Sequence, residues 1–236
     1  MKMYRLVEPA ALFVALAALF LSSAASAQGK WEVITREQGV VVSEKEVAGR
    51  DLPIFKGTTT INASVVEILA VLDDTSRNTQ WMHQCMDARM LKQINDLERI
   101  VYNRTDAPWP VDDRDVVIRS KLTIDRENRK VIVRFNSIQS PLMPEVSDAV
   151  RMPTLKGHYI FTILDFTKTQ VEYQIDADPG GMLPDWLISA TSKEIPLNTL
   201  VNMRNQVEKT RKSGIYKDFV KARSEQFGFT PEAQQK

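Results

Sequence analysis

Two short motifs contain residue types that could carry out chemistry. The motif His83-Gln84-Cys85 places an imidazole and a thiol on one face of an extended segment, as a base-activated thiol nucleophile would require. No third residue nearby in sequence would orient the histidine, so an exposed histidine beside a half-buried cysteine is the interpretation we favour. The acids Asp112, Asp113 and Asp115 form a cluster, but a calcium loop needs more oxygen ligands and a bidentate glutamate. The sequence therefore predicts no catalytic residue, no bound metal and no cofactor.

The acids follow a loop, 107–110, in which a tryptophan stands between two prolines. Each proline fixes its own φ and restricts the residue before it, so Trp109 is held on a stiff, extended backbone. Two interpretations stay open: Trp109 folds back over the rim of the core, or it faces a membrane–water boundary, which tryptophan favours. We expect Arg114 and Asp115 to have a structural role and to hold the base of the loop.

The first 27 residues have the form of a secretory signal peptide. Lys2 and Arg5 precede an unbroken apolar run of 12 residues, 10–21, and Ala25-Ser26-Ala27 matches a signal-peptidase site. The run is shorter than the about 20 residues that a membrane span needs, which argues against an uncleaved anchor. We expect residues 1–27 to be cleaved and the mature chain to be periplasmic or secreted.

Composition narrows the possible partners. The 31 basic and 30 acidic side chains give a net charge of +1, and no basic block occurs, which argues against nucleic acid as a partner. The single cysteine, Cys85, permits no internal disulfide, so the core must rest on apolar packing. We expect one domain over residues 28–213, followed by an extension, 214–236, that is weakly helical or frayed. We expect a monomer.

Hydrophobic periodicity predicts strands first, then a helix, more strands and a long last helix. The expected strands are 39–47, 54–61, 85–94, 98–105, 116–124, 130–138, 157–166 and 170–177. A first helix runs to Leu72 from a cap at Asn62 or Ser64, and a second covers 184–212 with Pro196 inside it. The fold class is therefore α+β, a curved antiparallel sheet wrapped around the C-terminal helix with an internal cavity.

Strand parity predicts which side chains face that cavity. Strand 98–105 is ambiguous, because either Ile100, Tyr102 and Arg104 or the alternate set with Asn103 could point inward; we favour the first set since Tyr102 is large. The predicted lining is Tyr102, Arg104, Ile118, Ser120, Leu122, Val133, Phe135, Tyr159, Phe161, Tyr173, Leu187 and Leu200. This apolar lining with scattered hydroxyls suits a lipid-like ligand, although most such residues simply fill a core.

Four motifs occur in a distinctive order. They are Trp81, then 107–110 with Arg114-Asp115, then Gly157-His158-Tyr159, and finally 178–186 leading into the helix that contains Pro196. In this pattern, over about 40–212, the chain resembles the StAR-related lipid-transfer (START) domain family, and the leader resembles that of a bacterial secreted member.

The resemblance implies a helix-grip fold that holds one lipid, often a sterol, phospholipid or sphingolipid. It implies that Trp109, Met182 and Leu183 lie at the cavity mouth and contact a membrane, that Pro184 and Trp186 are structural, and that the last helix acts as a lid. Some members keep a charged residue inside the cavity where this chain has Ser120, so the ligands of those members are not inferred here.

The main hypothesis is therefore binding and transfer of a hydrophobic lipid, with transient contact at a membrane surface and without enzymatic activity. One alternative is a cyclase- or hydrolase-type enzyme in the same cavity, for which Tyr102, Arg104 and His158 are the candidate groups. Another is a non-catalytic interaction module of the cell envelope.

Overall fold

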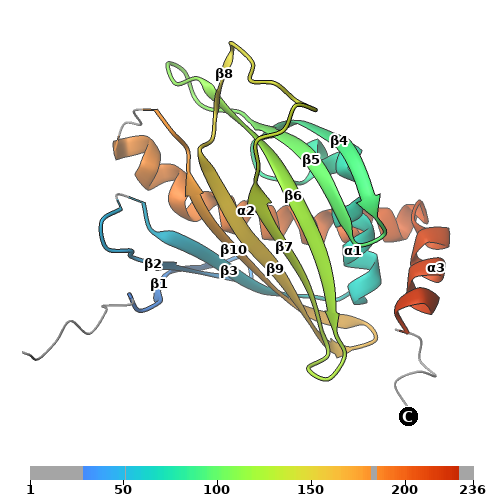
Figure 1. The fold of residues 1–236 in the computed structure, drawn as a ribbon. Coiled ribbons are helices and arrows are strands. Elements are labelled where there is room, and N and C mark those ends of the chain that lie inside the picture. The colour runs from blue at the N-terminus through green and yellow to red at the C-terminus, as the bar shows by residue number, and fades with distance from the viewer. Residues whose placement is uncertain (1–28, 51, 182–184, 229–236) are drawn as a thin grey trace, which may run out of the picture.

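The computed structural model describes residues 29–50, 52–181 and 185–228, with the backbone alone at 185–192. Its main feature is a curved sheet of ten strands in the order β1-β2-β3-β10-β9-β7-β6-β5-β4, with β8 beside β6 (Figure 1). The strands are β1 (Glu32–Glu37), β2 (Val40–Lys45), β3 (Ile54–Ile61), β4 (Cys85–Asn95), β5 (Glu98–Thr105), β6 (Asp113–Asp125), β7 (Lys130–Ser137), β8 (Ala149–Arg151), β9 (Thr154–Asp165) and β10 (Lys168–Asp178). The pairing is antiparallel except between β6 and β8.

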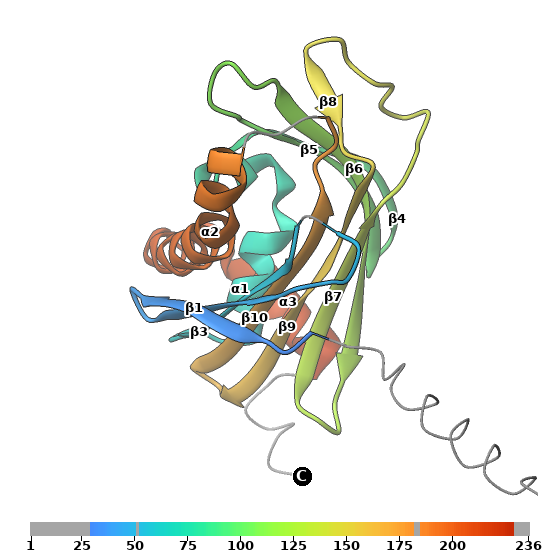
Figure 2. The ribbon, with the colours of Figure 1, turned by 90° about the vertical axis from the view of Figure 1, so that its left-hand side faces the viewer.

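The helices lie on the concave side of this sheet, so that sheet and helices form two layers (Figure 2). They are α1 (Val65–Asp73), the 3₁₀ helix η1 (Thr75–Gln80), α2 (Asp185–Ser213) and α3 (Lys217–Phe227). The long helix α2 crosses behind the strands in Figure 1. The α+β fold with a sheet wrapped around the long helix is therefore confirmed.

Local sequence explains how α1 begins and how α2 approaches the sheet. Of the two cap candidates, Ser64 is the N-cap: its Oγ accepts from the N–H of Glu67, and its own N–H donates to Glu67 Oε2 at 2.8 Å. At Gly57 of β3, an added Cβ would lie 2.7 Å from Leu200 Cδ1 and 3.3 Å from the Pro196 carbonyl oxygen. The glycine thus permits α2 to pack closely against the sheet.

Two strands were not expected from the sequence. β1 is an edge strand whose Val33 and Ile34 are exposed, so it lacks the alternation of buried and solvated residues that marks an inner strand. β8 has three residues and pairs with Asp113–Asp115, beyond the part of β6 that pairs with β7. Both strands extend the sheet without changing its concave face.

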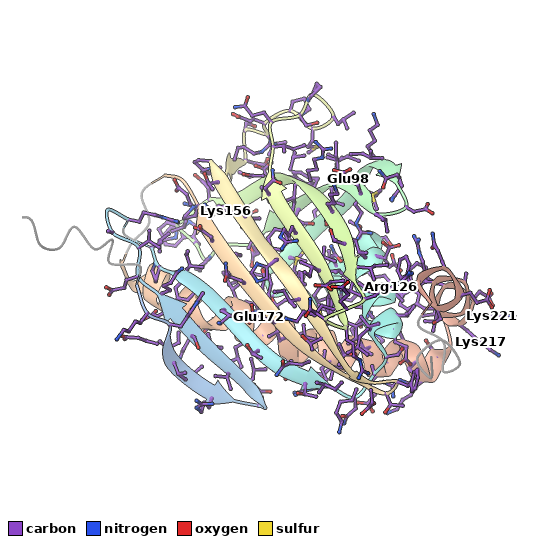
Figure 3. All side chains as sticks on the ribbon, turned by 60° about the horizontal axis from the view of Figure 1, so that its bottom comes forward. Glu98, Arg126, Lys156, Glu172, Lys217 and Lys221 are labelled. Atoms are coloured by element: carbon purple, nitrogen blue, oxygen red, sulfur yellow. The ribbon has the colours of Figure 1, made fainter. Side chains whose placement is uncertain are left out.

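The extension over 214–236, expected to be weakly helical or frayed, contains a regular helix in its described part, α3, and this helix packs on the domain. Phe227 at the end of α3 is 4% exposed and belongs to the main core. Arg126, labelled near α3 in Figure 3, donates to the Phe227 carbonyl oxygen at 3.0 Å. Tyr216 donates to Asp74 Oδ2 at 2.8 Å, just after α1. The short amphipathic pattern gave a weak signal, and tertiary packing supplies the stability.

No helix within the described part of the chain is both long enough and apolar enough to cross a membrane.

Candidate functional site

A cavity of about 250 Å³ lies between the concave face of the sheet and the layer formed by α1, η1 and α2. The structure brings together at its wall six of the residues predicted from strand parity: Ile118, Ser120, Val133, Phe135, Tyr159 and Tyr173. They come from β6, β7, β9 and β10, which are consecutive in the sheet. The wall is mainly apolar, and the opposite face carries charged residues such as Lys156 and Glu172 (Figure 3).

The prediction that Tyr102 and Arg104 line the cavity is wrong, because the alternate set of β5 faces inward. Val101 pairs with Ile118, and directly paired residues share a face of the sheet, so Val101, Asn103 and Thr105 line the cavity. The orientation of β5 follows from its register against β6, whose inward face was clear from the sequence; the size of Tyr102 did not indicate it.

Tyr102 and Arg104 instead stabilise the outer side of β5. Tyr102 is 1% exposed, and burial together with the charge of Asp115 raises its pKa to about 12. Arg104 binds Asp113 Oδ2 at 2.7 Å and Asp148 Oδ2 at 2.8 Å, and its hydrogen bond to Asp148 keeps the pKa of that carboxyl below its usual value. Both side chains therefore belong to structural networks outside the cavity.

Three further predicted lining residues do not line this cavity. Phe161 and Leu200 are fully buried, and the Phe161 ring stacks on Tyr159 with 5.9 Å between ring centroids. Leu122 lines a separate cavity of about 30 Å³ next to α3. The prediction was wrong for these three because parity gives the face of a strand and not the place where the helices leave space.

Some predicted residues fall outside the described part of the structure. These are Met182, Leu183 and Pro184, together with the side chains of Trp186 and Leu187. Their roles at the mouth, at the start of the last helix and in the lining remain predictions.

The proline-rich loop borders the cavity, but its tryptophan faces away from it. Ala107 and Pro108 line the cavity together with Pro179 from the turn before α2. Trp109 is 90% exposed, so the interpretation in which it folds back over the rim is wrong. The loop therefore presents a bare indole to solvent beside an opening of the cavity.

Arg114 and Asp115 point to opposite sides of β6. Asp115 is fully buried on the outer side and accepts from Arg151 at 2.7 and 2.9 Å. Arg114 lines the cavity and donates to the carbonyl oxygens of Gly180 at 3.1 Å and Asp112 at 2.5 Å. Burial lowers the pKa of Arg114, and no carboxylate of the described residues lies within ion-pair distance of it. The pair holds the loop base as expected, but the sequence did not reveal that Arg114 also faces the cavity.

The polar part of the lining contains residues that the sequence reasoning did not assign to it. The lining also includes Asn78, His83, Asn103 and Thr199. The backbone N–H of His83 donates to Thr199 Oγ1 at 3.4 Å. Asn78 lies on the short 3₁₀ helix η1 and His83 on the loop between η1 and β4, where no hydrophobic period indicates which side chains turn inward. Pairing with β6 could have identified Asn103.

Neither the His83-Gln84-Cys85 motif nor the acidic cluster Asp112, Asp113 and Asp115 shows signs of reactivity. Burial raises the pKa of the Cys85 thiol to about 11, which disfavours the nucleophilic thiolate at neutral pH. Burial also lowers the pKa of His83, although the charge of Glu194 opposes this. The other histidine, His158, contacts Glu172 at 3.1 Å outside the cavity. Among the described residues, no three His, Cys, Asp or Glu side chains are grouped as a metal site would need.

Three aromatic residues of the lining, Phe135, Tyr159 and Tyr173, form one cluster. The rings of Tyr159 and Tyr173 stack with 4.5 Å between centroids, and Phe135 lies 6.0 Å from Tyr159. Burial raises the pKa of both tyrosines, so both hydroxyls stay protonated at neutral pH. This neutral, buried wall can hold an apolar ligand.

The START domain family model matches residues 11–213. The chain belongs to the START domain family. An uncharacterized protein of Pseudomonas aeruginosa is 32% identical over 179 residues, which cover 76% of this chain and 87% of the relative. The phosphatidylcholine transfer protein of Bos taurus is 25% identical over 186 residues, or 78% of this chain and 86% of that protein.

Two solved structures extend this comparison. The STAR-related lipid transfer protein of Xanthomonas axonopodis superposes on this START domain with a TM-score of 0.69 at 30% identity, over 75% of this chain and 98% of that one. Human STARD10 has the same TM-score at 19% identity, over 77% and 74% of the two chains, and supports the helix-grip fold alone.

Proposed function

We propose that this START domain binds a lipid in its internal cavity and transfers it between membranes. The observation that carries the proposal is the cavity of about 250 Å³ with mainly apolar walls, enclosed between sheet and helices. Relatives whose names describe phosphatidylcholine transfer support it. Removal of the apolar lipid surface from water supplies the driving force, at about 25 cal/mol per Å².

The size of the cavity implies that lipid uptake requires motion. Drug-sized ligands occupy pockets of about 300–1,000 Å³, and the described cavity of about 250 Å³ is smaller than that. A lipid with two acyl chains therefore needs more space than this cavity offers. We propose that the loop 107–110 and the turn before α2 open, and that α2 acts as the lid.

We further propose that the protein has no enzymatic activity. The groups considered for an enzyme were Tyr102, Arg104 and His158, and all three lie outside the cavity. The titratable side chains that do line it include His83, whose pKa is lowered, and the arginines Arg99 and Arg114. Binding without bond breaking is the function that this lining supports best.

The proposed site of action is the periplasm or the cell exterior, with the protein as a monomer that touches membranes transiently. The leader of residues 1–27 supports export, and the exposed Trp109 beside the cavity supports membrane contact.

Native mass spectrometry tests the function and the export together. The full-length chain is expressed in a Gram-negative host and isolated from the periplasm. We expect the mass of a chain that begins near Gln28, together with a bound lipid that is released when the ion is activated by collision. A mature mass without any lipid, even after incubation with vesicles, would remove lipid binding from consideration.

A matched pair of variants links bound lipid to the cavity. Val133 is 5% exposed and lines the cavity, whereas Arg134 is exposed on the opposite face of β7. We expect Val133→Trp to fill the cavity and abolish lipid retention, and Arg134→Trp to retain lipid at the level of the unmodified protein. Circular dichroism would establish that both variants are folded.

A further inference from the structure

Two asparagine side chains in the cavity wall have hydrogen-bonding capacity that the protein does not use. Asn78 is 5% exposed and Asn103 is 8% exposed, and both line the cavity. The side-chain oxygen of each is buried and has no hydrogen-bond partner. Buried polar atoms are almost always paired, since an unpaired one bears its full desolvation cost. Two such oxygens in one ligand cavity therefore indicate a ligand that donates hydrogen bonds.

The two asparagines belong to one part of the cavity. Asn103 Nδ2 lies 3.9 Å from the sulfur of Met82, and the Met82 backbone N–H donates to the backbone carbonyl oxygen of Asn78 at 2.8 Å. Met82 thus lies between them and lines the same cavity. The two asparagines therefore belong to the part of the cavity wall that Met82 joins.

A buried positive charge lies at the same end of β5 and β6. Arg114 pairs with Thr105, which is two residues from Asn103 on the same face of β5. Arg114 is 8% exposed at the cavity wall, the groups to which its guanidinium donates are neutral backbone carbonyls, and the nearby charges of Asp112 and Asp113 act on it less than burial does. A phosphate oxygen of the ligand would complement this charge, because arginine binds phosphate with charge-assisted hydrogen bonds.

These surroundings do not suit a quaternary ammonium group. Such a group has no N–H to donate and is recognised by the faces of surrounding aromatic rings. Of the phenylalanines and tyrosines that line this cavity, Phe135, Tyr159 and Tyr173 come from β7, β9 and β10 and pack on one another, and Phe55 comes from β3. Asn103 is on β5, which β6 separates from β7.

We propose that Asn78 and Asn103 select a glycerophospholipid whose head group carries N–H or O–H donors, of the ethanolamine or glycerol type, over a choline lipid. This proposal rests on the proposed function and specifies its ligand. The head group donates to the two amide oxygens, and Arg114 faces the phosphate. The preference would differ from the ligand named for the phosphatidylcholine transfer proteins to which the chain is similar.

The test is competitive lipid loading of the mature protein. Vesicles containing equal amounts of phosphatidylethanolamine, phosphatidylglycerol and phosphatidylcholine with identical acyl chains are incubated with protein, and the retained lipids are quantified by mass spectrometry. We expect an ethanolamine or glycerol lipid to exceed the choline lipid by about tenfold. Asn78→Leu and Asn103→Leu should each reduce that ratio about three- to tenfold, the range expected when a buried oxygen loses its hydrogen bond.

A control variant and the total amount of lipid separate the possible outcomes. Asn136→Leu makes the same chemical change on the exposed face of β7 and should keep the wild-type ratio. Choline lipid retained as well as the others, with a ratio that neither cavity variant changes, would overturn the selectivity and leave lipid binding intact. Failure to retain lipid from any vesicle would overturn the proposed function itself. If one variant does not fold, the other still decides the question.

Discussion

Replacing Trp109 with aspartate should slow lipid transfer while leaving the fold intact. The indole is 90% exposed, so almost its whole surface is available to a membrane. Aromatic side chains bury about 150–250 Å² each, which at about 25 cal/mol per Å² corresponds to about 4–6 kcal/mol for complete burial. If half of that area enters the interface, the contribution is about 2–3 kcal/mol, and its loss weakens membrane binding by about 30-fold or more.

The assay is transfer of a fluorescent lipid between donor and acceptor vesicles at limiting vesicle concentration. Trp109→Phe serves as the matched control, because it retains most of the apolar area and should transfer within a few-fold of the unmodified rate. Both variants should keep Tm within about 2 °C, since the side chain lies on the surface. An unchanged transfer rate for Trp109→Asp would refute the idea that this loop contacts the membrane.

Two further predictions concern the support of the cavity. Asp115 is fully buried and Arg151 is 15% exposed, so Asp115→Ala leaves a largely buried guanidinium without its carboxylate and should cost about 3–5 kcal/mol. Calorimetry would show this as a Tm lower by about 10 °C; a change below 2 °C would contradict a structural role for the pair. Burial lowers the pKa of His83 below 6.5, so the unfolded chain binds this proton more tightly and stability falls as pH drops below about 6.5. His83→Gln should reduce that slope in urea unfolding between pH 7.5 and 5.5, and an identical slope would exclude His83 as its source.

The sheet could be predicted from the sequence because most of its strands expose one face to water. In β7, Val131, Val133 and Phe135 turn inward while Arg134 and Asn136 are exposed, and this alternation fixes both the strand and its orientation. Edge and very short strands lack that contrast, which is why β1 and β8 were not expected. The helix α3 was underestimated for a related reason, since its stability comes from docking on the core and not from its own sequence pattern.

The site was less predictable because its polar groups depend on tertiary arrangement. β5 is buried on both faces: Tyr102 points to one face and Asn103 to the other. The alternation of apolar and polar residues therefore could not show which face of β5 turns inward. Asn78 lies on a six-residue 3₁₀ helix, which is too short for a hydrophobic period to show which of its side chains turn inward. Arg114 was recognised as a residue of the loop base, yet its exposure to the cavity depends on the course of the turn before α2.

The position of Arg114 determines which substitutions can separate ligand recognition from gating. Its guanidinium lines the cavity and also donates to the carbonyl oxygens of Pro179 and Gly180, in the turn that leads toward α2. A substitution there removes a charge near the ligand and at the same time releases a segment of the proposed mouth. Asn78 and Asn103 have side-chain oxygens without a protein partner, so their replacement by leucine removes ligand contacts without freeing that turn. Apolar burial can retain many lipids, because it depends on area and not on direction, whereas a few placed polar groups decide among head groups. Selectivity measured in the asparagine variants therefore reports on recognition, and transfer rate measured in Trp109 variants reports on the membrane step.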